Sequence, residues 1–92
     1  MDDELRNAQA RREILAAYVT ALDDPARLLR VCAEVGGDND DARRAVAAAF
    51  GVSVHAADAI LALQVRRFTP REIDRVRGEL AEVDRRLRVL GA

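Results

Sequence analysis

The last third of the chain carries the apolar pattern that most strongly limits its possible folds. Apolar side chains are spaced alternately three and four residues apart at Ile73, Val76, Leu80, Val83, Leu87 and Leu90. This spacing predicts an α-helix with a coiled-coil seam, which needs a neighbouring helix along its whole length. We therefore expect an all-α fold in which the helix of residues 70–90 has a partner of similar length.

Residues 3–23 are the expected partner of that helix. Their apolar side chains also form one helical stripe, at Leu5, Ala8, Leu15, Tyr18, Val19 and Leu22. Because the two stripes have similar lengths, we expect an antiparallel pair of terminal helices, a short coiled coil with both ends of the chain together. A chain of 92 residues has room for one domain, so residues 24–69 are expected to form a cap of three short helices.

Capping residues and glycines divide residues 24–69 into helices. Aspartate and serine accept hydrogen bonds from free N–H groups in the first turn of a helix, and glycine readily ends one. The expected helices are residues 25–35, 39–50 and 54–68, capped by Asp24, Asp38 and Ser53, and the first two end at Gly36-Gly37 and Gly51. The run Thr69-Pro70-Arg71-Glu72 predicts a capping box at the start of the last helix.

The helix expected at residues 54–68 is apolar on nearly all sides. In so small a domain the neighbouring helices cover only part of it, so we expect a second chain, related by a two-fold axis, to cover the rest. The side chains expected toward the partner are Val54, Ala57, Asp58, Leu61, Ala62 and Val65, and those expected inside are Ala56, Ile60 and Leu63. The predicted assembly is a two-fold homodimer in which residues 24–69 form a globular dimerisation cap.

Arginine is concentrated between residues 66 and 77, where contact with DNA or an acidic partner is an alternative. The residues are Arg66, Arg67, Arg71, Arg75 and Arg77. The net charge of −1 argues against nucleic-acid or anionic-membrane binding by bulk attraction, so only this local cluster could hold DNA. Residues 43–61 superficially resemble a helix-turn-helix, but the second helix offers apolar and acidic side chains to the groove. A small DNA-binding regulator is the alternative function.

Few residues indicate catalysis or a bound group. Cys32 is the sole cysteine and lies on the apolar side of its helix, so a buried thiol and a cytoplasmic location are expected. His55 has no second histidine or cysteine nearby, so we expect no metal site, and Tyr18 is expected in the core. The sequence shows no catalytic motif or phosphate loop, and we expect no cofactor. No apolar stretch is long enough to cross a bilayer, and residues 1–4 are too acidic for a signal peptide.

One enzyme family shares the size and helical class of this chain. Residues 71–76, Arg-Glu-Ile-Asp-Arg-Val, resemble part of the helical dimeric chorismate mutases. The resemblance implies a dicarboxylate held by arginine and lysine on a long first helix. This chain has no lysine, and Pro25 and Gly36-Gly37 interrupt its helices early. A chorismate mutase-like enzyme is therefore the weaker alternative.

A longer resemblance extends from Ile14 to Leu90. The residues that carry it are, in order, Ala21-Leu22-Asp23, Phe50-Gly51-Val52-Ser53, Ala57, Ala59-Ile60-Leu61, Arg66-Arg67, Thr69 and Glu72. In order and spacing they resemble the C-gate region of the A subunit of bacterial type IIA topoisomerases, DNA gyrase and topoisomerase IV. The resemblance implies the globular end of a long antiparallel coiled coil, where two subunits meet through the helix corresponding to residues 54–68. That region is the exit gate for the transported DNA duplex.

The departures from the family imply a different role. Ala62-Leu63-Gln64 stands where the family usually has Asp-Met-Arg, so a more apolar interface with a different choice of partner is expected. The sequence has no counterpart of the winged-helix domain with its cleaving tyrosine, the metal-binding domain or the ATPase. The resemblance implies a stand-alone, non-catalytic C-gate-like dimerisation module. Its expected partners are a second copy and the A subunit of gyrase or topoisomerase IV, as a gyrase modulator or a DNA-associated self-protection protein.

Overall fold

The computed structural model describes residues 2–91, and the side chains of residues 3–91. Every regular element in this part of the chain is helical, as the sequence predicts. The elements are α1 (Asp2–Leu22), α2 (Pro25–Glu34), α3 (Asn39–Phe50), α4 (Val54–Leu61), the 3-10 helix η1 (Val65–Phe68) and α5 (Pro70–Val89). The molecule is elongated, with extents of 44 × 28 × 17 Å.

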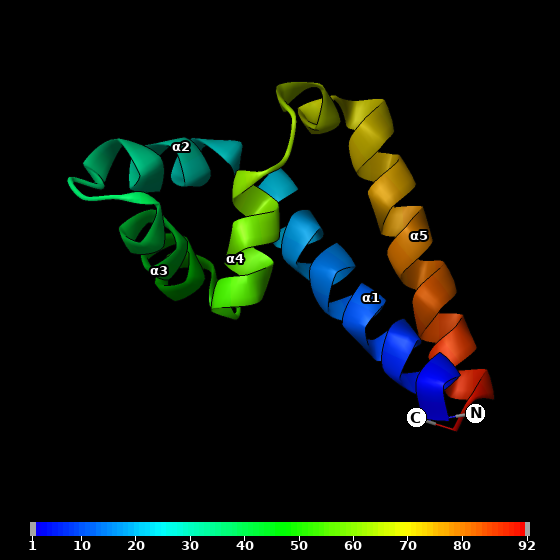
Figure 1. Ribbon diagram of the computed structural model, residues 1–92. Helices are drawn as coiled ribbons and strands as arrows, with labels where there is room; N and C mark the ends of the chain where they lie inside the picture. The colour runs from blue at the N-terminus through cyan, green and yellow to red at the C-terminus, as the bar shows by residue number, and fades with distance from the viewer. Residues whose placement is uncertain (1, 92) are drawn as a thin grey trace.

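Helices α1 and α5 run antiparallel along the long arm of the molecule (Figure 1). The start of α1 and the end of α5 lie at one end of this arm, and α2, α3 and α4 gather at the other. The seam of α5 buries Val76, Val83 and Leu87 against Ala8, Leu15 and Leu22 of α1. Apolar burial along both helices therefore holds the pair together, as the spacing of the seam predicts.

Ion pairs flank this seam and fix the register of the two helices. The Arg12 Nε lies 2.6 Å from the Asp84 Oδ1, and the Arg11 guanidinium lies 3.6 Å from the Glu79 carboxylate. Two further pairs join the arm near its ends, Arg86 with Glu4 and Arg77 with Asp23. All four pairs are solvent-exposed, so each contributes a fraction of a kcal/mol, about 0–1.

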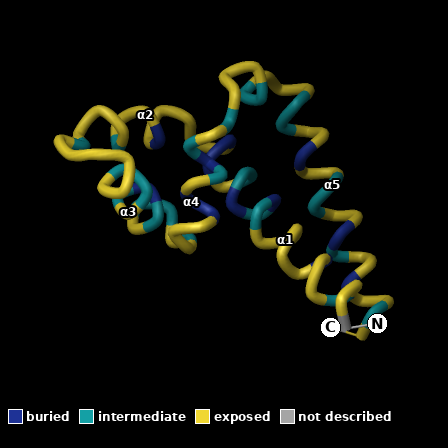
Figure 2. Tube along the Cα trace, in the orientation of Figure 1, coloured by how far each residue is buried: buried dark blue, intermediate teal, exposed yellow. Residues whose placement is uncertain are grey.

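The second cluster of buried side chains lies where α1 meets the short helices (Figure 2). Ala17 and Ala21 of α1 pack there with Ala56, Ala57 and Ile60 of α4, together with Leu28 of α2 and Val46 of α3. Tyr18 and Phe68 pack against both this cluster and the α1–α5 cluster. The two halves of the core are thus joined through these aromatic rings.

The short helices begin where the capping residues predict. Asp24 accepts a hydrogen bond from the Arg27 N–H at 3.2 Å, and Ser53 accepts one from the Ala56 N–H at 3.0 Å. Asp38 goes further and forms a reciprocal capping box with Asp41. The first helix of the cap ends one residue earlier than expected, at Glu34. Gly51 ends α3 in the left-handed conformation, with φ of 66°, which glycine adopts without strain.

Two expectations about the segment before α5 are wrong. The helix predicted at residues 54–68 stops at Leu61, and non-helical Leu63 and Gln64 separate it from η1. This break turns the chain back so that Leu63 and Phe68 reach the α1–α5 cluster, which a continuous helix would carry them past.

The capping box predicted at the start of α5 is also absent. Helix α5 begins at Pro70 as expected, but the Thr69 side chain forms no capping bond to the helix. Its hydroxyl donates instead to the Arg66 carbonyl, at 3.2 Å. The Glu72 carboxylate forms ion pairs instead, with Arg67 at 3.2 Å and with Arg75 at 3.7 Å.

Candidate functional site

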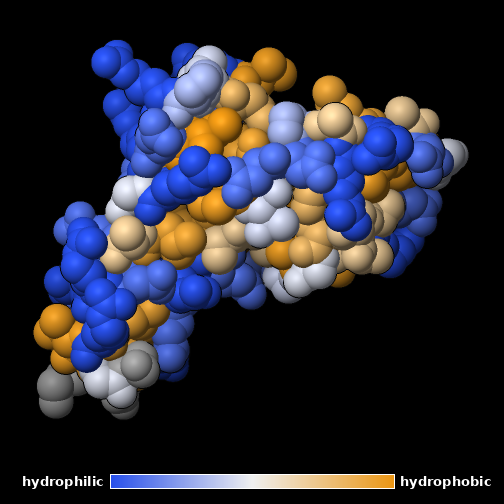
Figure 3. All heavy atoms as spheres, turned by 180° about the vertical axis from the view of Figure 1, so that it is seen from behind, coloured by the Kyte–Doolittle hydropathy of each residue, from blue (hydrophilic) through white to orange (hydrophobic). Residues whose placement is uncertain are grey.

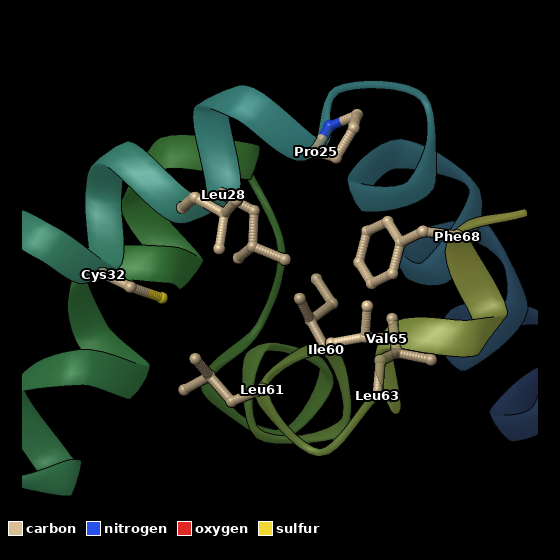
Figure 4. A pocket seen from close by; sticks show the side chains of 9 residues that line it. Pro25, Leu28, Cys32, Ile60, Leu61, Leu63, Val65 and Phe68 are labelled. Atoms are coloured by element: carbon tan, nitrogen blue, oxygen red, sulfur yellow. The ribbon is translucent and has the colours of Figure 1, made fainter.

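An apolar hollow of about 220 Å³ opens between α2, α4 and η1, and we call it the α2–α4 hollow (Figure 4). Its lining residues are Pro25, Leu28, Leu29, Cys32, Ile60, Leu61, Leu63, Val65 and Phe68. Leu28 and Ile60 form its floor, because both side chains are buried in the core. None of the nine residues carries a charge, in a chain of which 34% is charged. The hollow is therefore an uncharged, apolar feature of a surface that is otherwise rich in charge.

Two aliphatic side chains on opposite sides of the hollow are strongly exposed. Leu29 of α2 is 70% exposed and Val65 of η1 is 85% exposed. Seen from behind, hydrophobic side chains interrupt the hydrophilic surface around this end of the molecule (Figure 3). A single exposed aliphatic side chain is common in soluble proteins, but two beside one apolar hollow indicate a surface that binds a partner.

The structure divides the residues that the sequence predicts at a dimer contact. Those at the surface are Val54, Asp58, Leu61, Ala62 and Val65, of which Leu61 is partly buried. Ala57 is 0% exposed and packs inside, so its prediction as a contact residue is wrong. The reason is that α4 contacts both α1 and α3, and the short Ala57 side chain faces this junction. Ala56 and Ile60 lie inside as predicted, and Leu63 is partly buried.

Asp58 is engaged within the chain. Its Oδ1 accepts a hydrogen bond from the Arg43 Nε at 2.7 Å, which joins α4 to α3. The same contact with Asp58 raises the pKa of Arg43 above its ordinary value, so the guanidinium stays charged. Arg43 also pairs with Asp40, so Asp58 lies at the edge of the predicted contact surface as one of two carboxylates that share a guanidinium.

Most of the arginine-rich segment is neutralised by neighbouring carboxylates. Arg67 and Arg75 both pair with Glu72, and Arg77 pairs with Asp23 and Asp74. Within residues 3–91, Arg66 and Arg71 form no ion pair and are exposed. Two isolated guanidinium groups offer little of the clustered positive charge that phosphate contacts require. The predicted contact with DNA or an acidic partner thus has little support in the geometry.

The remaining candidate residues lie at the surface or between the two clusters. Cys32 is exposed and lines the α2–α4 hollow, so the expectation of a buried thiol is wrong. Helix α2 fully buries only Leu28 and partly buries Val31, and Cys32 lies outside the packed part of its apolar face. His55 is exposed, and Tyr18 is partly buried between the two clusters. Among the described residues, no group of three or more histidine, cysteine or acidic side chains could hold a metal ion.

The helices of residues 2–91 differ in length and apolar content from a helix that spans a bilayer. No single helix there is both long and apolar enough to cross a bilayer. Helices α3 and α4 would pass only as a pair, and the chain bends by 106° between them.

Comparison with known proteins gives the decisive observation. Over 80 residues, 87% of its length, the chain is 36% identical to the A subunit of DNA gyrase from Campylobacter jejuni. The chain is related to a segment of the DNA gyrase A subunit. The corresponding subunit from Synechocystis is 32% identical over 84 residues. No protein-family model matches the chain, and neither does any solved structure.

The gyrase A-like chain spans about a tenth of the length of these curated relatives, 9% and 10%. A stretch of 80 residues in a chain of 92 includes residues 13–80 wherever it begins. The similarity therefore covers all of α2, α3, α4 and η1, and with them the α2–α4 hollow.

Proposed function

We propose that this gyrase A-like chain is a non-catalytic dimerisation module of the C-gate type. Two copies associate through the outer surface of α4 and η1, with α1 and α5 as the arm that carries the contact. The exposed Val65 beside Leu61 is the observation that supports this most directly, because a valine with 85% of its surface in water gains by being covered. Similarity to the DNA gyrase A subunit over the same elements adds to it.

The size and shape of the chain support association. A domain of this length buries a smaller fraction of its surface than larger domains do, so a second chain adds stability that the core alone supplies only weakly. The α4–η1 surface lies at the end of the molecule away from the free ends of the arm, where two copies can approach without the arms colliding (Figure 1). A two-fold contact there leaves both arms pointing away from the interface.

An aspartate at position 65 tests this surface, with an aspartate at position 89 as the matched control. Both positions hold a valine that is 85% exposed, but Val89 ends α5 and lies far from the proposed contact. We expect a wild-type dimer by sedimentation velocity at micromolar concentration. V65D should weaken it about tenfold or more, since interface anchors contribute about 2 kcal/mol or more each, and about 1.4 kcal/mol is a factor of ten in affinity. V89D should remain dimeric.

Three results would contradict the module. A wild-type monomer at micromolar concentration removes the dimer. A dimer that V65D leaves intact moves the contact to another surface. Equal weakening by V65D and V89D shows that added negative charge, rather than the place of the contact, governs association.

The A subunit of gyrase is the second proposed partner. A surface that resembles part of that subunit can pair with it in place of a second copy, which would make the chain a modulator of gyrase or a protective protein. Mixing the purified chain with the gyrase A subunit should give co-elution on size exclusion and altered supercoiling when the B subunit is added. Neither effect at micromolar concentration would remove the modulator role and leave the homodimer standing.

A further inference from the structure

The dimer contact reaches further than the outer surface of α4. We infer that the α2–α4 hollow of each copy receives Leu29 from α2 of the other copy, so that α2 contributes to the contact together with α4. This inference rests on the proposed dimer, and its test below separates the two. Each copy then carries both the projecting side chain and the hollow that accepts it.

The surface has the shape that a two-fold contact requires. In an isologous interface the same patch meets itself, so any projection must find a matching recess on the same patch. Leu29 projects from one side of the hollow with 70% of its surface exposed, while Leu28, one residue earlier, points into the core. Of two consecutive leucines in α2, Leu28 therefore packs the helix against the core, and Leu29 projects from the surface.

The volume of the hollow suits an aliphatic side chain. A dry cavity of about 150 Å³ lined by leucine, isoleucine and phenylalanine is large enough to hold benzene. The α2–α4 hollow has about 220 Å³ and a similar lining, including Leu28, Ile60 and Phe68. A leucine side chain fits this space, and its burial replaces water that has almost no polar partner there.

The distribution of charge favours a second copy over an acidic or basic partner. A two-fold contact brings the charged groups near its axis close to the same groups of the other copy. Like charges then repel, so such a contact is favourable only where the patch is uncharged or self-complementary. The nine lining residues are all uncharged. A strongly charged partner would find no opposite charge in the hollow.

Cys32 makes the inference measurable, because its thiol lines the hollow and is exposed in the single chain. If Leu29 of a second copy fills the hollow, the thiol becomes inaccessible to an alkylating reagent. The chain has no other cysteine, so modification reports on this place alone.

The experiment measures the rate of Cys32 alkylation by N-ethylmaleimide at protein concentrations below and above the midpoint of self-association. We expect the wild-type rate to fall about tenfold or more at the higher concentration, as a buried interface excludes solvent. Leu29→Asp should keep the fast rate at both concentrations and weaken the dimer in sedimentation velocity. Its helical circular dichroism should match the wild type because Leu29 is mostly exposed. V89D is the control, with wild-type behaviour in both measurements.

The outcomes separate this inference from the proposed function. A wild-type dimer with unchanged alkylation, or one that Leu29→Asp leaves intact, overturns the role of α2 while the α4 contact stands. A monomer at every concentration overturns both. If Leu29→Asp alters the fold, the wild-type alkylation rates and the milder variant Leu29→Ala still decide the question.

Discussion

The α1–α5 arm and the end formed by α2, α3, α4 and η1 are held together by different means. The arm has a long apolar seam with ion pairs along its sides, so its charges are largely matched within the chain. The other end consists of short helices with side-chain caps around a core rich in alanine. It leaves Leu29 and Val65 in water around an uncharged hollow. The arm supplies its own cover, whereas the capped end presents a surface that a second molecule can cover.

The largest expected effect tests whether the two regions unfold together. Leu22 belongs to the arm cluster and Ile60 to the other cluster, and both are at most 2% exposed. Truncating either to alanine should cost about 3 kcal/mol. Because Tyr18 and Phe68 join the clusters, both variants should show one unfolding transition in calorimetry, lowered by about 10–20 °C. Two separate transitions, each moved by only one variant, would mean that the regions fold independently.

A smaller effect should separate capped from uncapped helix starts. Asp38→Ala removes the reciprocal box that begins α3 and should cost about 1 kcal/mol in urea unfolding. Thr69→Ala, at the start of α5, removes no capping bond and should change stability by less than about 0.5 kcal/mol. Equal losses would show that Thr69 stabilises the start of α5 in a way its contacts do not reveal.

The smallest expected effect concerns pH and Asp41. The Arg44 guanidinium, followed by the backbone N–H of Asp38, holds the pKa of Asp41 below its ordinary value. A lowered folded-state pKa adds stability above the unfolded pKa of about 4, and the gain disappears as pH falls through the folded value. Asp41→Asn should therefore have a lower melting temperature than the wild type at neutral pH. The gap should close as the pH is lowered below about 4.

Arg44→Gln provides the control for this pH dependence. It removes the largest cause of the lowered pKa of Asp41, so the effect of Asp41→Asn should shrink in that background. A gap of constant size at every pH would instead assign the effect of Asp41→Asn to its shape rather than to its charge.

The fold could be predicted from the sequence where the deciding contacts are local. The N-caps Asp24, Asp38 and Ser53 act within three residues of themselves, and α2, α3 and α4 begin where these caps predict. The seam of α5 could be predicted too, because its spacing repeats over five turns and only one other segment has a matching stripe.

The details that could not be predicted depend on contacts that reach beyond a single helix. Helix α4 stops at Leu61, and the following Leu63 and Phe68 pack against the α1–α5 cluster, which no local pattern indicates. Glu72 pairs with Arg67. It therefore forms no capping box at the start of α5, although the sequence motif for one is complete. Cys32 is exposed where the sequence predicts a buried thiol, and Ala57 is buried where it predicts a contact residue. The sequence shows that a helix has an apolar face, but not how much of that face its neighbours cover.

The antiparallel arm also has a mechanical consequence. The start of α1 lies beside the end of α5. Helix α5, with 20 residues, is about 30 Å long. A protein joined to both the start of α1 and the end of α5 is therefore attached at two adjacent points. The α1–α5 pair then acts as a stiff spacer between that protein and the short helices. A fluorophore or a surface tether placed there would sit about 30 Å from the hollow and leave it unobstructed. A host protein could accept this hairpin in a surface loop without its own ends being forced apart.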